Sequence, residues 1–154
     1  MTYLVENTDC NFLLHRIRED IADTKVGDGV VEIKGKKYST VGLRISKLRE
    51  YFGTNICTRF TLHEHTDEKV LVECEIILIN NNNHTVLANG FAEKRRDTNF
   101  ITRTSAVEFC QTTALGRACA GLGIIGDHNI ASAEEIYGAS EDNKQKPKIE
   151  VIDG

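Results

Sequence analysis

Three consecutive stretches of alternating apolar and polar residues do most to limit what this chain can fold into. They cover about residues 56–63, 70–78 and 85–93, and the asparagine-rich segment 80–83 separates the last two. Alternation with a period of two places successive side chains on opposite faces of a strand. Short turns between such strands favour antiparallel pairing, with one face buried and the other partly open. The pattern therefore predicts a three-stranded antiparallel meander with helices packed on one face.

Shorter patterns on both sides of the meander complete the predicted fold class, which is α+β. Residues 30–41 predict a β-hairpin that turns near Gly35. Apolar residues at helical spacing predict helices over about residues 9–24, 43–52, 105–122 and 131–137. Asp9 is the expected N-cap of the first helix, and Ser105 with Glu108 has the pattern of a capping box.

The chain of 154 residues has the length of one domain with its own core. We divide it into an N-terminal helix in residues 1–28, a core in residues 29–137 and a flexible C-terminal tail in residues 138–154. The tail is predicted because the sequence from Gly138 onward is polar and mixed in charge.

Composition excludes several classes of protein. The five cysteines are odd in number and form no C-x-x-C pair, so neither a disulfide framework nor a zinc site is expected. With no signal sequence and no long apolar run, a cytoplasmic protein without a membrane span is expected. The net charge is −4, but residues 30–117 hold 13 of the 19 Lys and Arg and only 10 of the 23 Asp and Glu. A mildly basic centre thus lies between acidic ends, as a site for a polyanion requires.

Residue patterns for catalysis are weak. His63, His65 and Glu73 could form a metal site of a small nuclease, because two histidines separated by one residue share a strand face. Solvated surface side chains are the alternative interpretation of all three. The spacing Gly121-x-Gly123-x-x-Gly126 fits a dinucleotide loop, but it follows a predicted helix and not a strand. No enzymatic activity, metal or nucleotide cofactor is therefore expected.

Cations interleaved with aromatic residues are the stronger signal, because cations follow a phosphate backbone and aromatic faces stack on unpaired bases. The aromatic members are Tyr38 and Phe91. The cationic members are Lys36, Lys37, Arg44, Lys94, Arg95, Arg96 and Arg103. Arg117 joins this set because it lies among alanines and glycines. A cation there either pairs with an internal carboxylate or points into a groove towards an anion.

Several of these residues fall in segments that resemble a known family. Residues 104–108 (TSAVE), 112–118 (TTALGRA) and 130–135 (IASAEE), with 36–41 (KKYSTV) and 88–93 (ANGFAE), resemble phage annealing proteins of the Sak and essential-recombination-function (ERF) kind. The order of elements is similar to the Rad-fifty-two-like core. The resemblance covers about residues 29–137. It departs from the family at Gly116, where eukaryotic relatives more often have a second cation, and in its acidic net charge.

The resemblance implies a protomer that assembles into rings or helical filaments and holds single-stranded DNA in a basic groove. Arg117 matches a helix arginine that lines this groove, and Arg44 lies near a second groove cation. The expected function is ATP-independent single-stranded DNA binding and annealing in phage-type recombination, with a phage exonuclease or host replication protein as a further partner. A protector of single strands that does not anneal them is the alternative, and a metal-dependent nuclease is a third.

Overall fold

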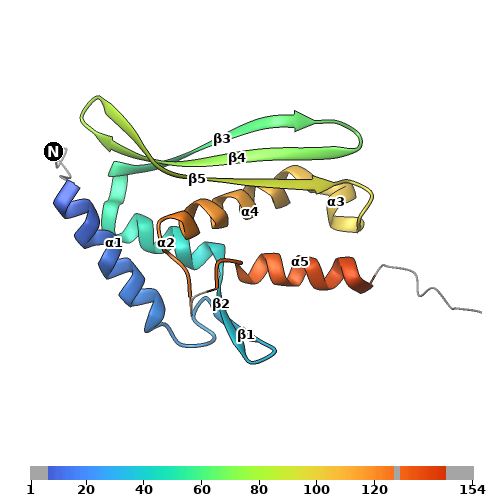
Figure 1. Ribbon diagram of the computed structural model, residues 1–154, viewed down its shortest axis with the longest axis horizontal. Helices are drawn as coiled ribbons and strands as arrows, with labels where there is room; N and C mark the ends of the chain where they lie inside the picture. The colour runs from blue at the N-terminus through green and yellow to red at the C-terminus, as the bar shows by residue number, and fades with distance from the viewer. Residues whose placement is uncertain (1–6, 127–128, 145–154) are drawn as a thin grey trace, which may run out of the picture.

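The computed structural model describes residues 7–126 and 129–144 and has an α+β fold, as predicted (Figure 1). Its helices are α1 (Asn7–Ala22), α2 (Val41–Phe52), the 3-10 turn η1 (Gly53–Asn55), α3 (Phe100–Thr104), α4 (Ala106–Gly121) and α5 (Ala133–Lys144). Its strands are β1 (Val30–Ile33), β2 (Lys36–Ser39), β3 (Ile56–His65), β4 (Lys69–Asn80) and β5 (Asn83–Arg95). None of the helices in the described part of the chain is long and apolar enough to cross a membrane.

The predicted hairpin is confirmed as a separate two-stranded ribbon, β1–β2. Its two-residue turn consists of Lys34 and Gly35, with φ of 51° and 77°. Two positive φ angles are typical of the turn that matches the twist of antiparallel strands. Figure 1 shows that the ribbon projects its lysine-rich tip away from the larger sheet.

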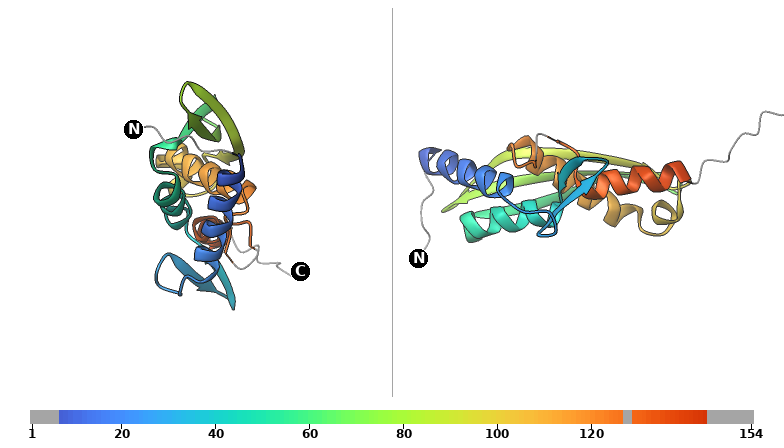
Figure 2. Two further views of the ribbon diagram at one scale, coloured as in Figure 1. Left: turned by 90° about the vertical axis from the view of Figure 1, so that its left-hand side faces the viewer. Right: turned by 90° about the horizontal axis from the view of Figure 1, so that it is seen from below.

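The larger sheet has the predicted meander order, β3-β4-β5, with both pairs antiparallel. Asn81 and Asn82 make the turn between β4 and β5, and Asn81 adopts a φ of 54°. The helices lie on one side of this sheet in both directions of view (Figures 1 and 2). Helix α4 packs on β4 and β5.

Close approach between α4 and β5 depends on small residues. A Cβ atom added to Gly90 would overlap the carbonyl oxygen of Ala114 and would lie 2.5 Å from the amide nitrogen of Ala118. Both alanines and Cys110 are fully buried against the sheet. The small-residue stripe of this helix thus brings its backbone directly onto the strand.

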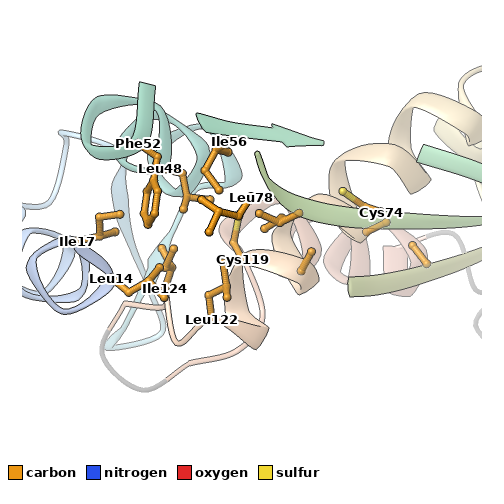
Figure 3. Packing of buried hydrophobic residues seen from close by; sticks show 14 of the residues in the cluster. Leu14, Ile17, Leu48, Phe52, Ile56, Cys74, Leu78, Cys119, Leu122 and Ile124 are labelled. Carbon is orange, nitrogen blue, oxygen red and sulfur yellow. The ribbon is translucent and has the colours of Figure 1, made fainter. Parts of the chain in front are cut away.

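The main core lies where α1, α2 and the end of α4 meet the sheet. Leu14 and Ile17 of α1 face Leu48 and Phe52 of α2, and Ile124 closes the cluster from below (Figure 3). Cys74, Cys110 and Cys119 are buried apolar residues, and burial raises the pKa of the Cys74 and Cys119 thiols to about 12.

The helices leave part of this face of the sheet exposed. Phe60 and Leu62 of β3 pair in register with Cys74 and Val72, so they share the face that the helices cover. They nevertheless remain 38% and 47% exposed. The part of β3 that contains Phe60 and Leu62 is therefore an apolar sheet edge that the helices leave partly exposed.

Two local predictions, both of helix caps, differ from the structure. Helix α1 already includes Asn7, so Asp9 lies inside its first turn and is not the N-cap. The side chain of Ser105 makes no capping hydrogen bond. The reciprocal pattern is made one helix earlier, where Asn99 and Thr102 bond to each other's backbone amides at 3.0 Å.

The expected tail is the third difference. Helix α5 runs through Gly138 to Lys144, so the first part of the tail is helical. Residues 145–154 lie outside the described part of the chain. The absence of a side chain at Gly138 lets this helix lie close to Phe109, because a Cβ atom there would lie 2.8 Å from Cζ of Phe109.

Candidate nucleic-acid interface

The structure distributes the ten predicted site residues over four places. The hairpin holds Lys36, Lys37 and Tyr38; the end of β5 and α3 holds Arg95, Arg96 and Arg103; the cleft beside α4 holds Phe91, Lys94 and Arg117; and the interior holds Arg44. The residues therefore do not form one continuous basic stripe on a single protomer.

Arg44 corrects the prediction most clearly, because its exposure is 0% and it cannot contact a phosphate. Its Nε donates to Oγ of Ser39 at 2.8 Å, and its Nη1 donates to the carbonyl oxygens of Gly116 and Ile130 at 2.9 and 3.1 Å. Its Nη2 donates to the carbonyl oxygen of Ala131 at 3.2 Å. Burial lowers the pKa of this guanidinium. Arg44 ties α2 to the end of β2, to α4 and to the segment before α5.

The hairpin presents Lys36 and Lys37 to solvent, and Tyr38 is half-buried. The carbonyl oxygen of Lys37 accepts a hydrogen bond from Nδ2 of Asn129 at 2.9 Å, which fixes the strand to the segment before α5. Both lysines remain candidates for phosphate contacts, and the aromatic ring beside them, that of Tyr38, is only partly exposed.

The end of β5 is a surface of mixed charge. Nε of Arg96 donates to the carbonyl oxygen of Thr66 at 2.8 Å, and Arg95 pairs with Asp97 at 3.3 Å. Asp97 has a lowered pKa because of its hydrogen bonds from Arg95. Three arginines and three acidic side chains share one shallow hollow: Arg95, Arg96 and Arg103 with Asp67, Glu68 and Asp97. This neutral balance gives an anion little net attraction.

The remaining three residues border a cleft of about 450 Å³ between β5, α4 and α5. Nζ of Lys94 lies 5.1 Å from the ring centroid of Phe109, which comes from α4. A cation at this distance over an aromatic ring is held by the ring's electron density. Phe91 borders the same cleft and is half-exposed. The ring of Phe91 points to the outer face of the sheet, because Phe91 pairs in register with Glu73 and lies against His63. The cleft is therefore lined by two cations, by the ring of Phe109 and by two carboxylates, those of Glu93 and Glu135.

Arg117 lies in this cleft and is paired. Its Nη2 and Nε donate to Oε2 of Glu135 at 2.6 and 3.0 Å. The Arg117 side chain is 46% exposed, and the Glu135 side chain is 11% exposed. The two possibilities left open by the sequence are therefore combined, since the guanidinium faces the cleft while it binds an almost buried carboxylate.

The other carboxylate oxygen of Glu135 helps to begin α5. Oε1 accepts from the backbone amide of Ser132 at 3.4 Å, and Oγ of Ser132 accepts from the amide of Glu135 at 3.3 Å. This reciprocal pair is a capping box. Glu134 anchors the same turn to α2, because both its oxygens lie 3.1 Å from the amide nitrogen of Val41.

Thr113 is the third residue of this surface that the sequence reasoning missed, with Phe109 and Glu135. It is 9% exposed, and its Oγ1 has no hydrogen-bond partner within residues 7–126 and 129–144. Phe109, Thr113 and Arg117 follow one another at intervals of four along α4, so they share one helix face. That spacing is the signal by which Arg117 could have led to the other two.

The outer face of the sheet is different in character. Its charged side chains pair with one another across the strands, as shown by Arg59 with Glu75 at 2.7 Å and His63 with Glu73 at 3.2 Å. The ring of Phe91 lies 5.9 Å from that of His63. This face is therefore charge-compensated, as is the cleft, which Glu93 and Glu135 line together with Lys94 and Arg117.

The arrangement of the proposed nuclease ligands contradicts the metal-site hypothesis. A β-bulge between Leu62 and Glu64 shifts the register, so that His65 pairs with Val70 of the helix-covered face. His63 lies on the outer face beside Glu73, so the two imidazoles do not share a face. No group of three or more His, Cys, Asp or Glu that could hold a metal ion occurs among the described residues.

No model of a known protein family matches the chain, and a search of curated proteins finds no match either.

Proposed function

We propose that this protein binds single-stranded DNA and anneals complementary strands without ATP, as part of phage-type homologous recombination. The proposal rests on the resemblance of residues 29–137 to annealing proteins and on the cleft between β5, α4 and α5. It acts by binding and not by bond chemistry, so it is not an enzyme and needs no cofactor. Its place of action is the cytoplasm of the host cell.

The observation that carries the proposal is that two cations and an aromatic ring meet in the cleft. Lys94 and Arg117 supply two positive charges and Phe109 supplies the ring beside Lys94, while Phe91 lies at the rim with its ring on the outer face of the sheet. Phosphate contacts give affinity that is independent of sequence. Base stacking on an aromatic side chain adds about 1–3 kcal/mol per base and favours unpaired strands. The combination suits a single strand better than a duplex.

Assembly into a ring or filament is the second part of the proposal. Strand β3 is an edge of the sheet, and its Phe60 and Leu62 side chains are partly exposed. An uncovered apolar edge strand is a template for association. A second copy of the chain would bury it and would align the clefts of neighbouring protomers. Light scattering is expected to find an oligomer larger than a dimer, and a monomer with and without oligonucleotide would exclude assembly.

A strand-annealing assay tests the proposed function directly. The protein is mixed with two complementary labelled oligonucleotides without ATP, and duplex formation is followed over time. Faster annealing than in protein-free buffer supports an annealing protein. Retardation of single strands without faster annealing identifies the alternative, a protector. Shortening of the strands with Mg²⁺ or Mn²⁺ would identify a nuclease. A phage exonuclease or a host replication protein is the partner class to test next.

A further inference from the structure

We infer that Glu135 is a built-in competitor of the DNA phosphate for Arg117, and that strand binding loosens α5 from α4. This inference rests on the proposed function, because it concerns the regulation of the same cleft. In the free protein the carboxylate takes the position at the guanidinium that a phosphate would take.

The contact between Arg117 and Glu135 has the chemistry of a phosphate contact. Two guanidinium nitrogens converge on one anionic oxygen at 2.6 and 3.0 Å. Guanidinium groups bind carboxylate and phosphate oxygens with the same donor geometry. Because Arg117 is 46% exposed, a ligand can reach it without unfolding the protein.

The hydroxyl of Thr113 is a buried polar group at the contact between α4 and α5. Its hydroxyl is buried beside Glu135 and Ala139, yet it lacks a hydrogen-bond partner within the described chain. A buried hydroxyl without a partner destabilises the state that buries it. Movement of α5 away from α4 would let water or a nucleotide form a hydrogen bond with this hydroxyl. The unpaired hydroxyl therefore destabilises the closed state, in which α5 packs on α4.

Helix α5 is attached at its first turn, where Glu134 binds the backbone of α2 and Glu135 binds Arg117 of α4. Further along the helix, Gly138 lies close to the ring of Phe109. Loss of the Arg117 bond removes one of these attachments. The exchange of Glu135 for phosphate is therefore coupled to the position of the helix.

Two variants separate this mechanism from a simple charge effect. Glu135→Gln weakens the pair with Arg117 but keeps an oxygen for the capping box, in which Gln is as suitable as Glu. Glu108→Gln makes the same change in net charge at an exposed position of α4. A third variant, Gly138→Ala, changes no charge but adds a methyl group 2.8 Å from the Phe109 ring, which pushes α5 outward.

The experiment measures the binding of labelled oligo(dT) to the full chain by fluorescence anisotropy. Glu135→Gln is expected to tighten binding about three- to tenfold, and Glu108→Gln by less than about twofold, because the first alone removes a partly desolvated pair. Gly138→Ala is expected to tighten binding in the same direction. Hydrogen exchange of the α5 amides is expected to speed up when oligo(dT) binds to the wild-type protein.

Each other outcome overturns the inference, and the outcomes differ in what they say about DNA binding. If Glu135→Gln and Glu108→Gln bind equally, the competitor role is wrong while DNA binding stands. If oligo(dT) binds without any change in α5 exchange, the coupling is wrong. If neither the wild-type protein nor Glu135→Gln binds oligo(dT), the proposed function fails together with the inference. Thermal melting of each variant checks that it is folded.

Discussion

The regions around Arg44 and Arg117 use the same side chain for opposite purposes. Arg44 is 0% exposed and donates only to uncharged oxygens, one hydroxyl and three carbonyls. Arg117 is nearly half exposed and binds one carboxylate. A guanidinium bound by backbone carbonyls from distant segments holds a fold together, because no competing ligand can enter. A half-exposed guanidinium bound by one carboxylate is available for exchange.

The largest expected effect follows from removing Arg44, the buried one of these two arginines. Arg44→Ala leaves Gly116, Ile130 and Ala131 with unsatisfied carbonyl oxygens and opens a cavity, so a loss of about 3 kcal/mol or more in unfolding free energy is expected. Arg44→Lys should recover little of it, since an ammonium cannot reach four acceptors in three directions. Urea unfolding measures both variants, and wild-type stability in Arg44→Ala would show that Arg44 has no structural role.

Arg117→Ala should have the reverse profile, with a smaller effect on folding than Arg44→Ala and a clear effect on binding. The guanidinium is half exposed but its partner Glu135 is almost buried, so loss of the pair should lower the unfolding free energy by about 1–2 kcal/mol. The affinity for oligo(dT) should fall about tenfold, the equivalent of one charge-assisted contact. Arg117→Lys, which keeps the charge, should bind better than Arg117→Ala. A large melting shift with unchanged affinity would assign Arg117 to the same structural class as Arg44.

Thr113→Val sharpens the comparison by changing the contact beside Arg117 without changing charge. It replaces the unpartnered hydroxyl with a methyl group of similar size, so the protein should gain about 1 kcal/mol in stability. For a chain of this length that gain corresponds to a rise of about 2–4 °C in Tm. Binding should weaken slightly because α5 is held more firmly. A decrease in Tm would show that the hydroxyl contributes to the closed state.

The smallest expected effect concerns the acid stability of a contact made by α2, the helix that contains Arg44. There the hydroxyl of Tyr51 donates to Asp20 and joins α2 to α1, and this hydrogen bond lowers the pKa of Asp20. A lowered folded-state pKa stabilises the protein above the ordinary value of 3.8, and the contribution is lost as the pH falls through the folded-state pKa. The stability difference between Tyr51→Phe and wild type should therefore shrink as the pH falls below 3.8 and passes through the lowered folded-state pKa of Asp20. A difference that stays constant as the solution is acidified would exclude this linkage.

Local patterns in the sequence predicted the strands well, and they failed where distant segments meet. Alternation located β3, β4 and β5 because sheet side chains have a fixed period. Arg44 was misplaced because its carbonyl acceptors, Gly116 and Ile130, lie 72 and 86 residues away, in segments whose proximity no local pattern reveals. The pairing of Arg117 with Glu135 could not be predicted from a local pattern either, because Glu135 belongs to another helix.

Capping predictions show the same limit on a smaller scale. Ser105 and Glu108 have the residue types of a capping box, but the backbone of Ser105 follows α3 directly and its side chain makes no cap. Ser132 and Glu135 have the same pattern and do form one. Residue type alone cannot distinguish the two cases, because the conformation of the preceding backbone determines whether the hydroxyl can accept a hydrogen bond from an amide of the first helical turn.

The salt dependence of oligonucleotide binding tests the central claim most directly, namely that the cleft containing Arg117 holds the phosphates of a single strand. Anisotropy titrations of oligo(dT) and of a duplex of equal length are made over a range of salt concentrations with wild type and Arg117→Ala. Tighter binding to the single strand is predicted, with a log–log salt slope that is shallower by about 0.7 in the variant, the share of one phosphate contact. Binding that is insensitive to salt, or a slope that Arg117→Ala leaves unchanged, would contradict the account.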